Sequence, residues 1–354
     1  QTFSYSNQNF YGLEISLTWI CLLNWIPIFY LFISIQDFLK TNSQRLKVAI
    51  FLVSGTIPVL ITGLGQYFFN WEGPLSFGNG LVIWYLKAIE PHLGLSGLFS
   101  NQNYAGTWLS VIWPFNLSLI LINKNNIFKK SLSLLFLLIT TLAIVLTTSR
   151  NALLGIIFSI PIITGIKSIV LILLIIILLS ILLIFESYIP FSNQILNFTN
   201  SLIPQQLLDK FQKINLVNIY EYRRINLWKD AFSIISKKPF FGLGAAFFPI
   251  LYEVLYEPIN YTERHTHNLF IELTASYGFI VSILTFAFIA SLIFLSWKSI
   301  LKNKETTDKF FNKSWLAASI IIVISQMNDI TYYDGRISVV FWILLAGLRN
   351  IIIE

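Results

Sequence analysis

The chain has 354 residues, of which 55% are hydrophobic and only 12% are charged. Its mean hydropathy of +0.70 lies far above the values of soluble globular domains and excludes that class. The single cysteine, Cys21, excludes both a disulfide framework and a cysteine-based metal site. Several apolar runs are long and free of charge, so we predict an all-α, polytopic transmembrane helical bundle.

Apolar runs separated by mostly short connections predict about nine membrane-spanning helices. The fifth run is short and contains Pro161, which predicts a tilted or broken helix. The chain opens at Gln1 without an initiator methionine, so we treat the number of spans as a minimum. The spans are expected at about residues 14–34, 47–69, 104–122, 131–149, 151–166, 167–186, 268–297, 314–328 and 337–353.

Two connections, 70–103 and 187–267, are long, and function is expected to concentrate in them. The predicted organisation has three parts. These are N-terminal transmembrane helices over 1–186, an extracytoplasmic loop with an amphipathic interfacial helix over 187–267, and C-terminal transmembrane helices over 268–354.

Basic residues in the short loops predict the orientation of the spans, because cytoplasmic loops retain positive charge. The extracytoplasmic side then holds 70–103, the junction at Arg150, 187–267 and the turn 329–336. The net charge of +7 mostly reflects the basic residues of the predicted cytoplasmic loops, so it indicates membrane orientation. No nucleic-acid partner is expected, since that would call for basic residues interleaved with aromatic residues on a soluble face. The cytoplasmic residues are Lys40, Arg45, Lys47, Lys124, Lys129, Lys130, Lys167, Lys298, Lys302, Lys304, Lys309 and Lys313.

The same orientation places several distant ionisable residues at one aqueous boundary. Arg150 lies in a hinge too short for a free loop, and its guanidinium could bind the phosphate oxygens of a lipid-linked diphosphate. An interfacial anchor is the alternative. The residues expected at this boundary are Arg150, Arg223, Arg224, Arg264, His265 and His267.

Residues 224–235 predict an amphipathic helix, because apolar residues recur there at helical spacing. We expect this helix to lie on the bilayer, and an interfacial helix packed on the bundle is the alternative. Trp228 is expected to be an anchor or a packing residue. The basic pair and proline at 237–239 end the helix, and the glycine-containing turn 240–244 follows.

His267 stands at the mouth of a membrane helix, where an ionisable group is costly and is therefore a functional candidate. Near neutral pH it could take a proton from an attacking hydroxyl, and a structural histidine is the alternative. Asn268, Glu272 and Ser276 follow at intervals of four residues and form a polar stripe on one helical face. Glu272 could orient a base or balance an arginine, or pair structurally inside the bundle.

Arg336 lies near Asp329 and Asp334 in the last extracytoplasmic turn. We expect Arg336 to be an interfacial anchor. The alternative is that it lines the same extracytoplasmic cavity as the ionisable residues named above.

Several short motifs follow one another along the chain. Gly-x-Phe-x-Asn-x-Asn covers 97–103, Thr-Ser-Arg covers 148–150, an arginine-and-tryptophan run covers 224–228, Pro-x-x-Gly-x-Gly covers 239–244 and His-Asn-x9-Gly covers 267–278. In this order they resemble the O-antigen ligase and O-antigen polymerase superfamily of bacterial membrane proteins that transfer glycans.

The resemblance extends over about residues 95–297. Val281 stands where the ligase version often has Gly, Thr or Tyr, and the first motif lacks the proline often found in it. The departure at Val281 weakens the resemblance to the ligase subtype but does not affect the resemblance to the superfamily.

The resemblance implies an inverting glycosyltransferase with a C-type multi-helix fold. It would transfer a glycan from an undecaprenyl-diphosphate-linked donor to an acceptor hydroxyl at the periplasmic face of the bacterial inner membrane. His267 would activate the hydroxyl, while Arg150 and Arg224 hold the diphosphate. We predict a reaction without metal or cofactor, since the chain lacks an Asp-x-Asp motif and a His or Asp cluster with metal-ligand spacing. The expected substrate-binding residues are Arg223, Arg264, His265, Asn268, Glu272 and Asn103.

The acceptor separates three related activities, and the sequence leaves all three open. A ligase in lipopolysaccharide biosynthesis, the version we favour, uses lipid A core; a polymerase uses a second lipid-linked glycan; a protein O-glycosyltransferase uses a protein. A polysaccharide transporter would place charges near the bilayer midplane and often shows internal repeats, and neither is clear here. A purely structural membrane module is opposed by the long loop with its arginines.

Overall fold

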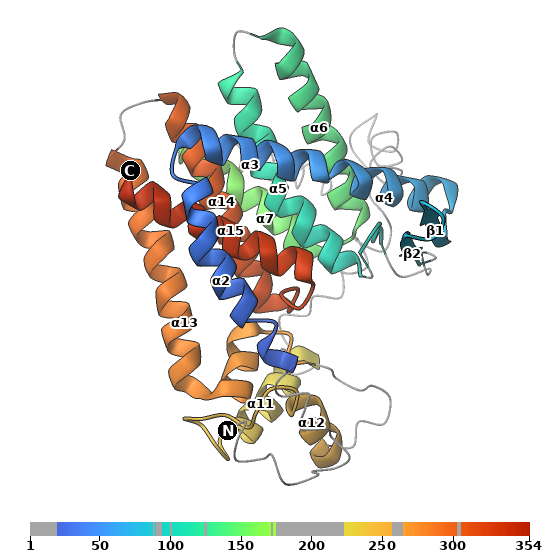
Figure 1. The fold of residues 1–354 in the computed structure, drawn as a ribbon, viewed down its shortest axis with the longest axis vertical. Helices are drawn as coiled ribbons and strands as arrows, with labels where there is room; N and C mark the ends of the chain where they lie inside the picture. Colours follow the sequence, from blue (N-terminus) through green and yellow to red (C-terminus); the bar gives the residue numbers. More distant parts are fainter. Residues whose placement is uncertain are drawn as a thin grey trace, which may run out of the picture. The chain divides into compact units, whose positions relative to one another are not determined.

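The residues that the structure describes fold mostly into helices (Figure 1), several of which are long and apolar. A computed structural model describes residues 20–87, 89, 94–99, 101–123, 126–170, 173–174, 223–256, 265–302 and 306–354. The helices are α2 (Ile26–Ser34), the 3-10 helix η1 (Ile35–Phe38), α3 (Asn42–Gly55), α4 (Ile57–Phe69), α5 (Gln102–Ile122), α6 (Ile127–Leu146), α7 (Arg150–Thr164), α11 (Arg223–Ile235), α12 (Phe248–Tyr256), α13 (Leu269–Lys302), α14 (Thr306–Asn328) and α15 (Gly335–Ile353). This architecture confirms the predicted all-α, polytopic membrane protein.

Within the described ranges, 7 helices are long and apolar enough to cross a membrane. They correspond to the first four and the last three predicted spans. The fifth predicted span is α7, whose 15 residues rise only about 22 Å, less than the roughly 30 Å of a hydrocarbon core. The sixth, 167–186, lies mostly outside the described residues. The helices are Ile20–Phe38, Asn42–Phe69, Gln102–Ile122, Ile127–Leu146, Leu269–Lys302, Lys309–Asn328 and Gly335–Ile353.

A two-stranded hairpin follows α4, and the sequence analysis did not predict it. β1 (Gly73–Phe77) pairs antiparallel with β2 (Val82–Leu86), with Leu75 opposite Trp84. The residues 78–80 between them, Gly-Asn-Gly, have φ angles of 59°, 56° and 90°. Glycine reaches this left-handed region freely and asparagine tolerates it, so the chain can reverse there.

The chain divides into two compact units, each made of discontinuous segments. The first unit contains 1–41, 215–299 and 322–354, and the second contains 42–214 and 300–321. The division predicted from the sequence follows the membrane spans and stays a prediction.

In the second unit, α5 packs on α6 and α7, and small residues lie at its contact with α7. A Cβ added at Gly106 would lie 2.8 Å from the Cβ of Ser149, and one at Gly155 would lie 3.4 Å from the Cβ of Ser110. Such residues allow helix backbones to approach closely where no hydrophobic effect drives association inside the membrane.

Arg45 differs from its expected place in an exposed cytoplasmic loop. It lies in the first turns of α3, and its side chain is fully buried in the second unit. Its Nη2 donates to Oδ1 of Asn312 at 3.5 Å. A buried guanidinium needs hydrogen-bond partners, and Asn312 supplies one from a helix distant in sequence.

In the first unit, α15 packs on α2. Trp25 stacks on Tyr332 with ring centroids 4.5 Å apart, and Trp342 meets the ring of Phe32 at 5.6 Å. The Nε1 of Trp342 donates to the Tyr332 hydroxyl at 2.9 Å, which in turn donates to the backbone carbonyl of Asn24 at 3.2 Å. These contacts hold the segment just before α15.

The longest described helix, α13, breaks at Gly278, where φ is 88° and ψ is 169°. The loop 239–244 lies against the break. The amides of Leu243 and Gly244 donate to the carbonyls of Ala275 at 2.7 Å and Ser276 at 3.0 Å, and the amide of Phe279 donates to Pro239 at 2.8 Å. These bonds satisfy backbone groups that the broken helix leaves open.

Backbone lies directly on backbone at this contact. A Cβ at Gly278 would stand 2.1 Å from the carbonyl oxygen of Phe240, and a Cβ at Gly242 would stand 2.6 Å from the carbonyl carbon of Ser276. Only glycine fits at either position. The glycines of two motifs that are distant in sequence therefore serve one packing contact.

The structure contains the amphipathic helix predicted at 224–235, as α11. Its apolar face is covered by protein, which agrees with the alternative of a helix packed on the bundle. Its position at the bilayer surface stays a prediction. The buried cluster consists of Leu227, Ala231, Ile234 and Ile235 of α11 with Phe248 of α12 and Ile271 and Ala275 of α13.

Candidate functional site

The turn before α13 is fixed at its end by Asn268. The Asn268 Oδ1 accepts the amides of Phe270 at 3.0 Å and Ile271 at 3.2 Å, as the side chain of an N-cap residue does. Its Nδ2 donates to the backbone carbonyl of Met327, near the end of α14, at 3.0 Å. Asn268, expected to bind substrate, thus ties the histidine turn to two helix ends.

The centre of the turn is held by Thr266, which is fully buried. Its amide donates to Oε2 of Glu272 at 2.9 Å, and its hydroxyl donates to the carbonyl of Asn268 at 2.9 Å. The Nε1 of Trp228 donates to the Thr266 carbonyl at 2.9 Å. Three side chains from two helices and the turn itself therefore keep this backbone in one conformation.

Glu272 was expected among the substrate-binding residues. The structure places it in the first turn of α13 with only 5% of its surface exposed. The carboxylate accepts the Thr266 amide, so the role seen here is structural support of the turn. Trp228 is likewise a packing residue, as the sequence predicted.

His267 lies between these anchors with a φ of 55°, in the left-handed region. Its Nδ1 lies 2.9 Å from Oδ1 of Asp329. The imidazole is 27% exposed, whereas the Asp329 side chain is only 7% exposed. A carboxylate accepts, so this contact keeps the ring proton on Nδ1 and leaves Nε2 with the lone pair.

Asp329 is positioned by a tight turn between α14 and α15. The Gln326 Nε2 donates to the Thr331 hydroxyl at 2.7 Å, and Gln326 Oε1 accepts the Tyr332 amide at 2.9 Å. Burial raises the pKa of the Tyr332 phenol. Residues 329–332 of the turn are therefore enclosed by protein, whereas Tyr333 is exposed.

His265 lies beside His267 and Asp329, and the three side chains form a group of possible metal ligands. Its ring centroid lies 4.3 Å from that of His267, and the two rings meet at 74°. The amide of His267 donates to the Nδ1 of His265 at 3.3 Å. One ligand atom from each of His265, His267 and Asp329 lies within 4.8 Å of the others, a separation at which a metal ion could be held.

The arginines expected in the site are divided between the two units. Arg224 is half-buried on α11 of the first unit, one residue after Arg223. Arg150 is the exposed first residue of α7 in the second unit. Arg264 lies outside the described residues. The structure thus brings together His265, His267, Asn268 and Glu272, while the joint action of the arginines with them stays a prediction.

The hinge before Arg150 is rigid. Thr148 has a φ of 53°, and its hydroxyl donates to Oε1 of Gln102 at 3.2 Å. A Cβ at Gly94 would stand 2.3 Å from the carbonyl oxygen of Thr147, so a second loop presses against this hinge. A cation at a helix N-terminus is electrostatically unfavourable, and a bound anion would reverse that effect.

Asn103 lies in the first turn of α5, next to Gln102. Its amide donates to Oδ1 of the N-cap residue Asn101 at 2.7 Å. The Asn-x-Asn motif therefore begins α5, and the intervening Gln102 connects it to the hinge before Arg150.

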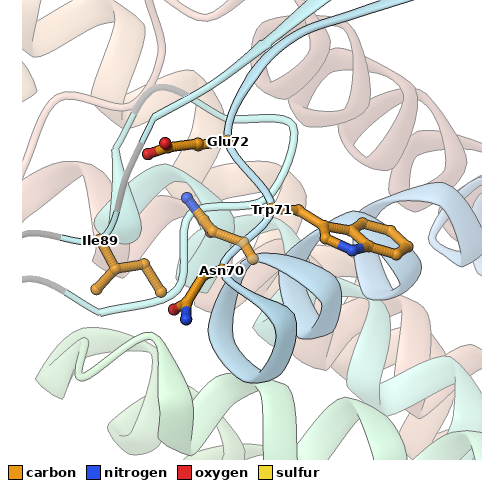
Figure 2. A pocket seen from close by; sticks show the side chains of 5 residues that line it. Asn70, Trp71, Glu72 and Ile89 are labelled. Atoms are coloured by element: carbon orange, nitrogen blue, oxygen red, sulfur yellow. The ribbon is translucent and has the colours of Figure 1, made fainter.

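The connection after α4 encloses a pocket of about 210 Å³ in the second unit, shown in Figure 2. Gln66, Asn70, Trp71, Glu72 and Ile89 line it. The Trp71 ring points away from the other labelled side chains, and a Cβ at Gly65 would overlap it at 2.1 Å, so the indole packs on α4. The Gln66 Oε1 accepts the amides of Ser96 and Gly97, both at 2.9 Å.

The middle part of the chain is similar to a known family. Residues 135–286 match the O-antigen ligase family model. The match confirms the resemblance to the O-antigen ligase and polymerase superfamily. No curated protein matches the chain.

The part that matches the O-antigen ligase family runs from α6 into α13. It contains Arg150, Arg224 and His267, and also Gly278, whose role in the structure is the backbone contact with the 239–244 loop. The motif therefore combines an ionisable residue with the glycine that lets the chain pack around it.

Asp329 is the residue of the site that sequence reasoning missed as a partner of His267. It lies outside the matched range, and 62 positions separate it from the histidine. The available signal was weak: an aspartate directly after an apolar span, in a turn assigned to the same face as His267. Many such aspartates are ordinary loop residues, so only the contact of the turn before α13 with the end of α14 identifies this one.

Proposed function

We propose that this protein is a glycosyltransferase that moves a glycan from an undecaprenyl-diphosphate-linked donor onto an acceptor hydroxyl. It acts as an O-antigen ligase at the periplasmic face of the bacterial inner membrane, in lipopolysaccharide biosynthesis. The observation that carries the proposal is the 2.9 Å contact of His267 with the buried Asp329, in a chain whose middle part matches the O-antigen ligase family.

His267 acts as the general base in this proposal. Asp329 orients the imidazole and keeps the proton on Nδ1, so that Nε2 can accept the proton of the acceptor hydroxyl. The oxygen then attacks the anomeric carbon, the bond from that carbon to the diphosphate breaks, and the configuration inverts. The hydrogen bonds of Thr266 to Glu272 and Trp228 support this role, because they hold the turn that carries the base.

Arg150 and Arg224 stabilise the leaving diphosphate. A guanidinium binds phosphate oxygens bidentately and keeps its charge at every physiological pH. Arg224 lies four residues before Trp228 on α11, so both belong to one helical face. Since Trp228 bonds to Thr266, this spacing supports a diphosphate position near the histidine turn. Neutralisation by arginine would make the reaction independent of metal.

The acceptor separates the versions of the proposal. Lipid A core would make the protein a ligase, a second lipid-linked glycan would make it a polymerase, and a protein would make it an O-glycosyltransferase. The membrane lipids surround the protein and hold the donor in each version. The alternative from a different functional class is a transporter that moves the lipid-linked glycan. Such a transporter requires no general base.

The test is glycan transfer in proteoliposomes that contain the full chain and undecaprenyl-diphosphate oligosaccharide, with EDTA present. Lipid A core, additional donor or a protein is supplied as the acceptor, and a gel shift reports the product. We expect transfer to lipid A core by the wild type and a loss of at least about 100-fold in His267→Ala and Arg150→Ala.

Arg224→Ala is compared with Lys229→Ala, which removes an exposed cation from the same helix. We expect the first variant to lose transfer and the second to retain it. A ladder formed from donor alone would identify a polymerase. Wild-type rates in both His267→Ala and Arg150→Ala would refute the assigned site, and movement of the donor without any transfer would support the transporter.

A further inference from the structure

We propose that His265, His267 and Asp329 bind a divalent transition metal of the zinc type, and that the bound ion inhibits glycan transfer. The binding step rests on the geometry of the three side chains alone. The inhibition rests on the proposed function, because it requires His267 to be the base.

The three side chains supply a suitable set of donors at suitable distances. Ligand atoms on a tetrahedral ion with bonds of about 2.0–2.1 Å lie roughly 3.3 Å apart. One ligand atom from each residue lies within 4.8 Å of the others, and the Nδ1 of His267 lies 2.9 Å from the Asp329 carboxylate. Small rotations of the side chains therefore bring all three atoms to bonding distance.

The chemistry of the donors selects the kind of ion. Two imidazoles and one carboxylate suit zinc, cobalt, nickel and copper, whereas magnesium and calcium prefer sites made of oxygen atoms. Three protein ligands leave a fourth position for water or substrate. His265 and His267 are both partly exposed, so an ion can enter from the aqueous side.

The surrounding structure keeps the donors in place before any ion arrives. Thr266, between the two histidines, is bonded through its amide to Glu272 and through its carbonyl to Trp228. Asp329 lies in a turn in which Gln326 bonds to the adjacent residues Thr331 and Tyr332. Fixed ligands of this kind lose little conformational entropy on binding, which favours affinity.

Binding would remove the groups that the proposed reaction uses. The ion binds Nδ1 of His267 in place of its proton, which moves to Nε2, and it also binds the Asp329 oxygen that orients the ring. The imidazole can then neither turn toward a hydroxyl nor accept its proton, so transfer stops. Chelation restores the reaction because it returns the His267–Asp329 hydrogen bond.

Cobalt binding tests the first half of the proposal in purified full chain, treated with EDTA and then freed of chelator. We titrate Co²⁺, follow the visible absorption of a cobalt ion with nitrogen and oxygen ligands, and then displace it with Zn²⁺. His265→Gln and Asp329→Asn should weaken binding at least about tenfold, since each removes or weakens a ligand. His92→Ala is the matched control, because His92 is the one histidine of the 3 that the proposed site does not include. This variant should bind cobalt as the wild type does.

Equal affinities in His265→Gln, Asp329→Asn and the wild type would overturn the site, as would the absence of cobalt absorption. Melting temperatures of the variants show that the fold is intact. The measurement needs no donor or acceptor, so it stands even when glycan transfer fails.

The second half is tested with transfer-competent proteoliposomes. We expect micromolar Zn²⁺ to reduce the wild-type rate at least about tenfold and EDTA to restore it. Rates that Zn²⁺ leaves unchanged or raises would overturn the inhibition, even if the ion binds. A chain that binds cobalt but transfers no glycan to any acceptor would support the metal site and refute the proposed function.

Discussion

Replacement of Gly278 by alanine should strongly destabilise the first unit. The residue has φ 88° and ψ 169°, a combination open almost only to glycine, and another residue there costs about 1–3 kcal/mol. The new Cβ would also lie 2.1 Å from the carbonyl oxygen and 2.3 Å from the carbonyl carbon of Phe240. Backbone atoms cannot rotate away as a flexible side chain can.

Relief of this clash requires the 239–244 loop to leave α13. That movement breaks three backbone hydrogen bonds of 2.7–3.0 Å, each worth about 1 kcal/mol. Strain and lost bonds together amount to about 4–6 kcal/mol. This is a large part of the 5–15 kcal/mol by which a typical domain is stable.

The assay is thermal unfolding of the purified chain in detergent, followed by tryptophan fluorescence. Gly335→Ala is the control, because a Cβ there meets nothing within 4 Å. We expect Gly278→Ala to melt about 5–20 °C below that control. Equal melting temperatures for the two variants would refute the account of the backbone contact.

A double variant makes the test sharper. Gly242→Ala disturbs the same contact from the opposite side, with a Cβ 2.6 Å from Ser276. Because either substitution already separates the loop from α13, Gly242→Ala combined with Gly278→Ala should cost clearly less than the sum of the two. Additive costs would show that the glycines serve separate contacts.

Three further predictions follow from the site. Asp329→Asn keeps the size of the side chain but removes the carboxylate that orients His267, so transfer should fall about 10²–10⁴-fold in the proteoliposome assay with little change in melting temperature; an unchanged rate would refute the pairing. Trp228→Phe removes the donor to the Thr266 carbonyl and should cost about 1–2 kcal/mol in thermal unfolding, whereas a stability equal to wild type would show that the bond is unimportant. Burial raises the pKa of Tyr332 above its usual 10.0, so the unfolded chain ionises first and stability should fall as pH rises above 10.0. Tyr332→Phe should make that alkaline loss smaller, and an identical pH profile would contradict the argument.

The helices were predictable because their signals are local. A run of about 20 apolar residues has no favourable place in water, and only a helix satisfies its backbone inside a bilayer. The spacing of Leu227, Ala231 and Ile234 likewise predicted α11 before its partners were known. The hairpin between 73 and 86 was not predicted, because its short strands lie in a segment that was interpreted only as a long connection between spans.

The site was predictable in part. His267 stood out through its place at a helix mouth, and the motif around it matches the O-antigen ligase family. Asn268 and Glu272 were predicted as parts of one polar stripe, and the sequence could not tell substrate contact from support of the turn. The hydrogen bonds to Met327 and Thr266 show support of the turn, and substrate contact stays a prediction.

By itself the sequence determined that this protein is a polytopic helical membrane protein whose middle part matches the O-antigen ligase family, since composition, apolar run length and motif order are properties of the chain alone. Only the tertiary structure decided that His267 pairs with Asp329, that Gly242 and Gly278 form one contact, and that His265 joins a group of metal-binding donors. These pairings join segments far apart in the sequence. They depend on how the helices pack. That packing results from many weak contacts together, so it cannot be predicted from the residue type at any single position.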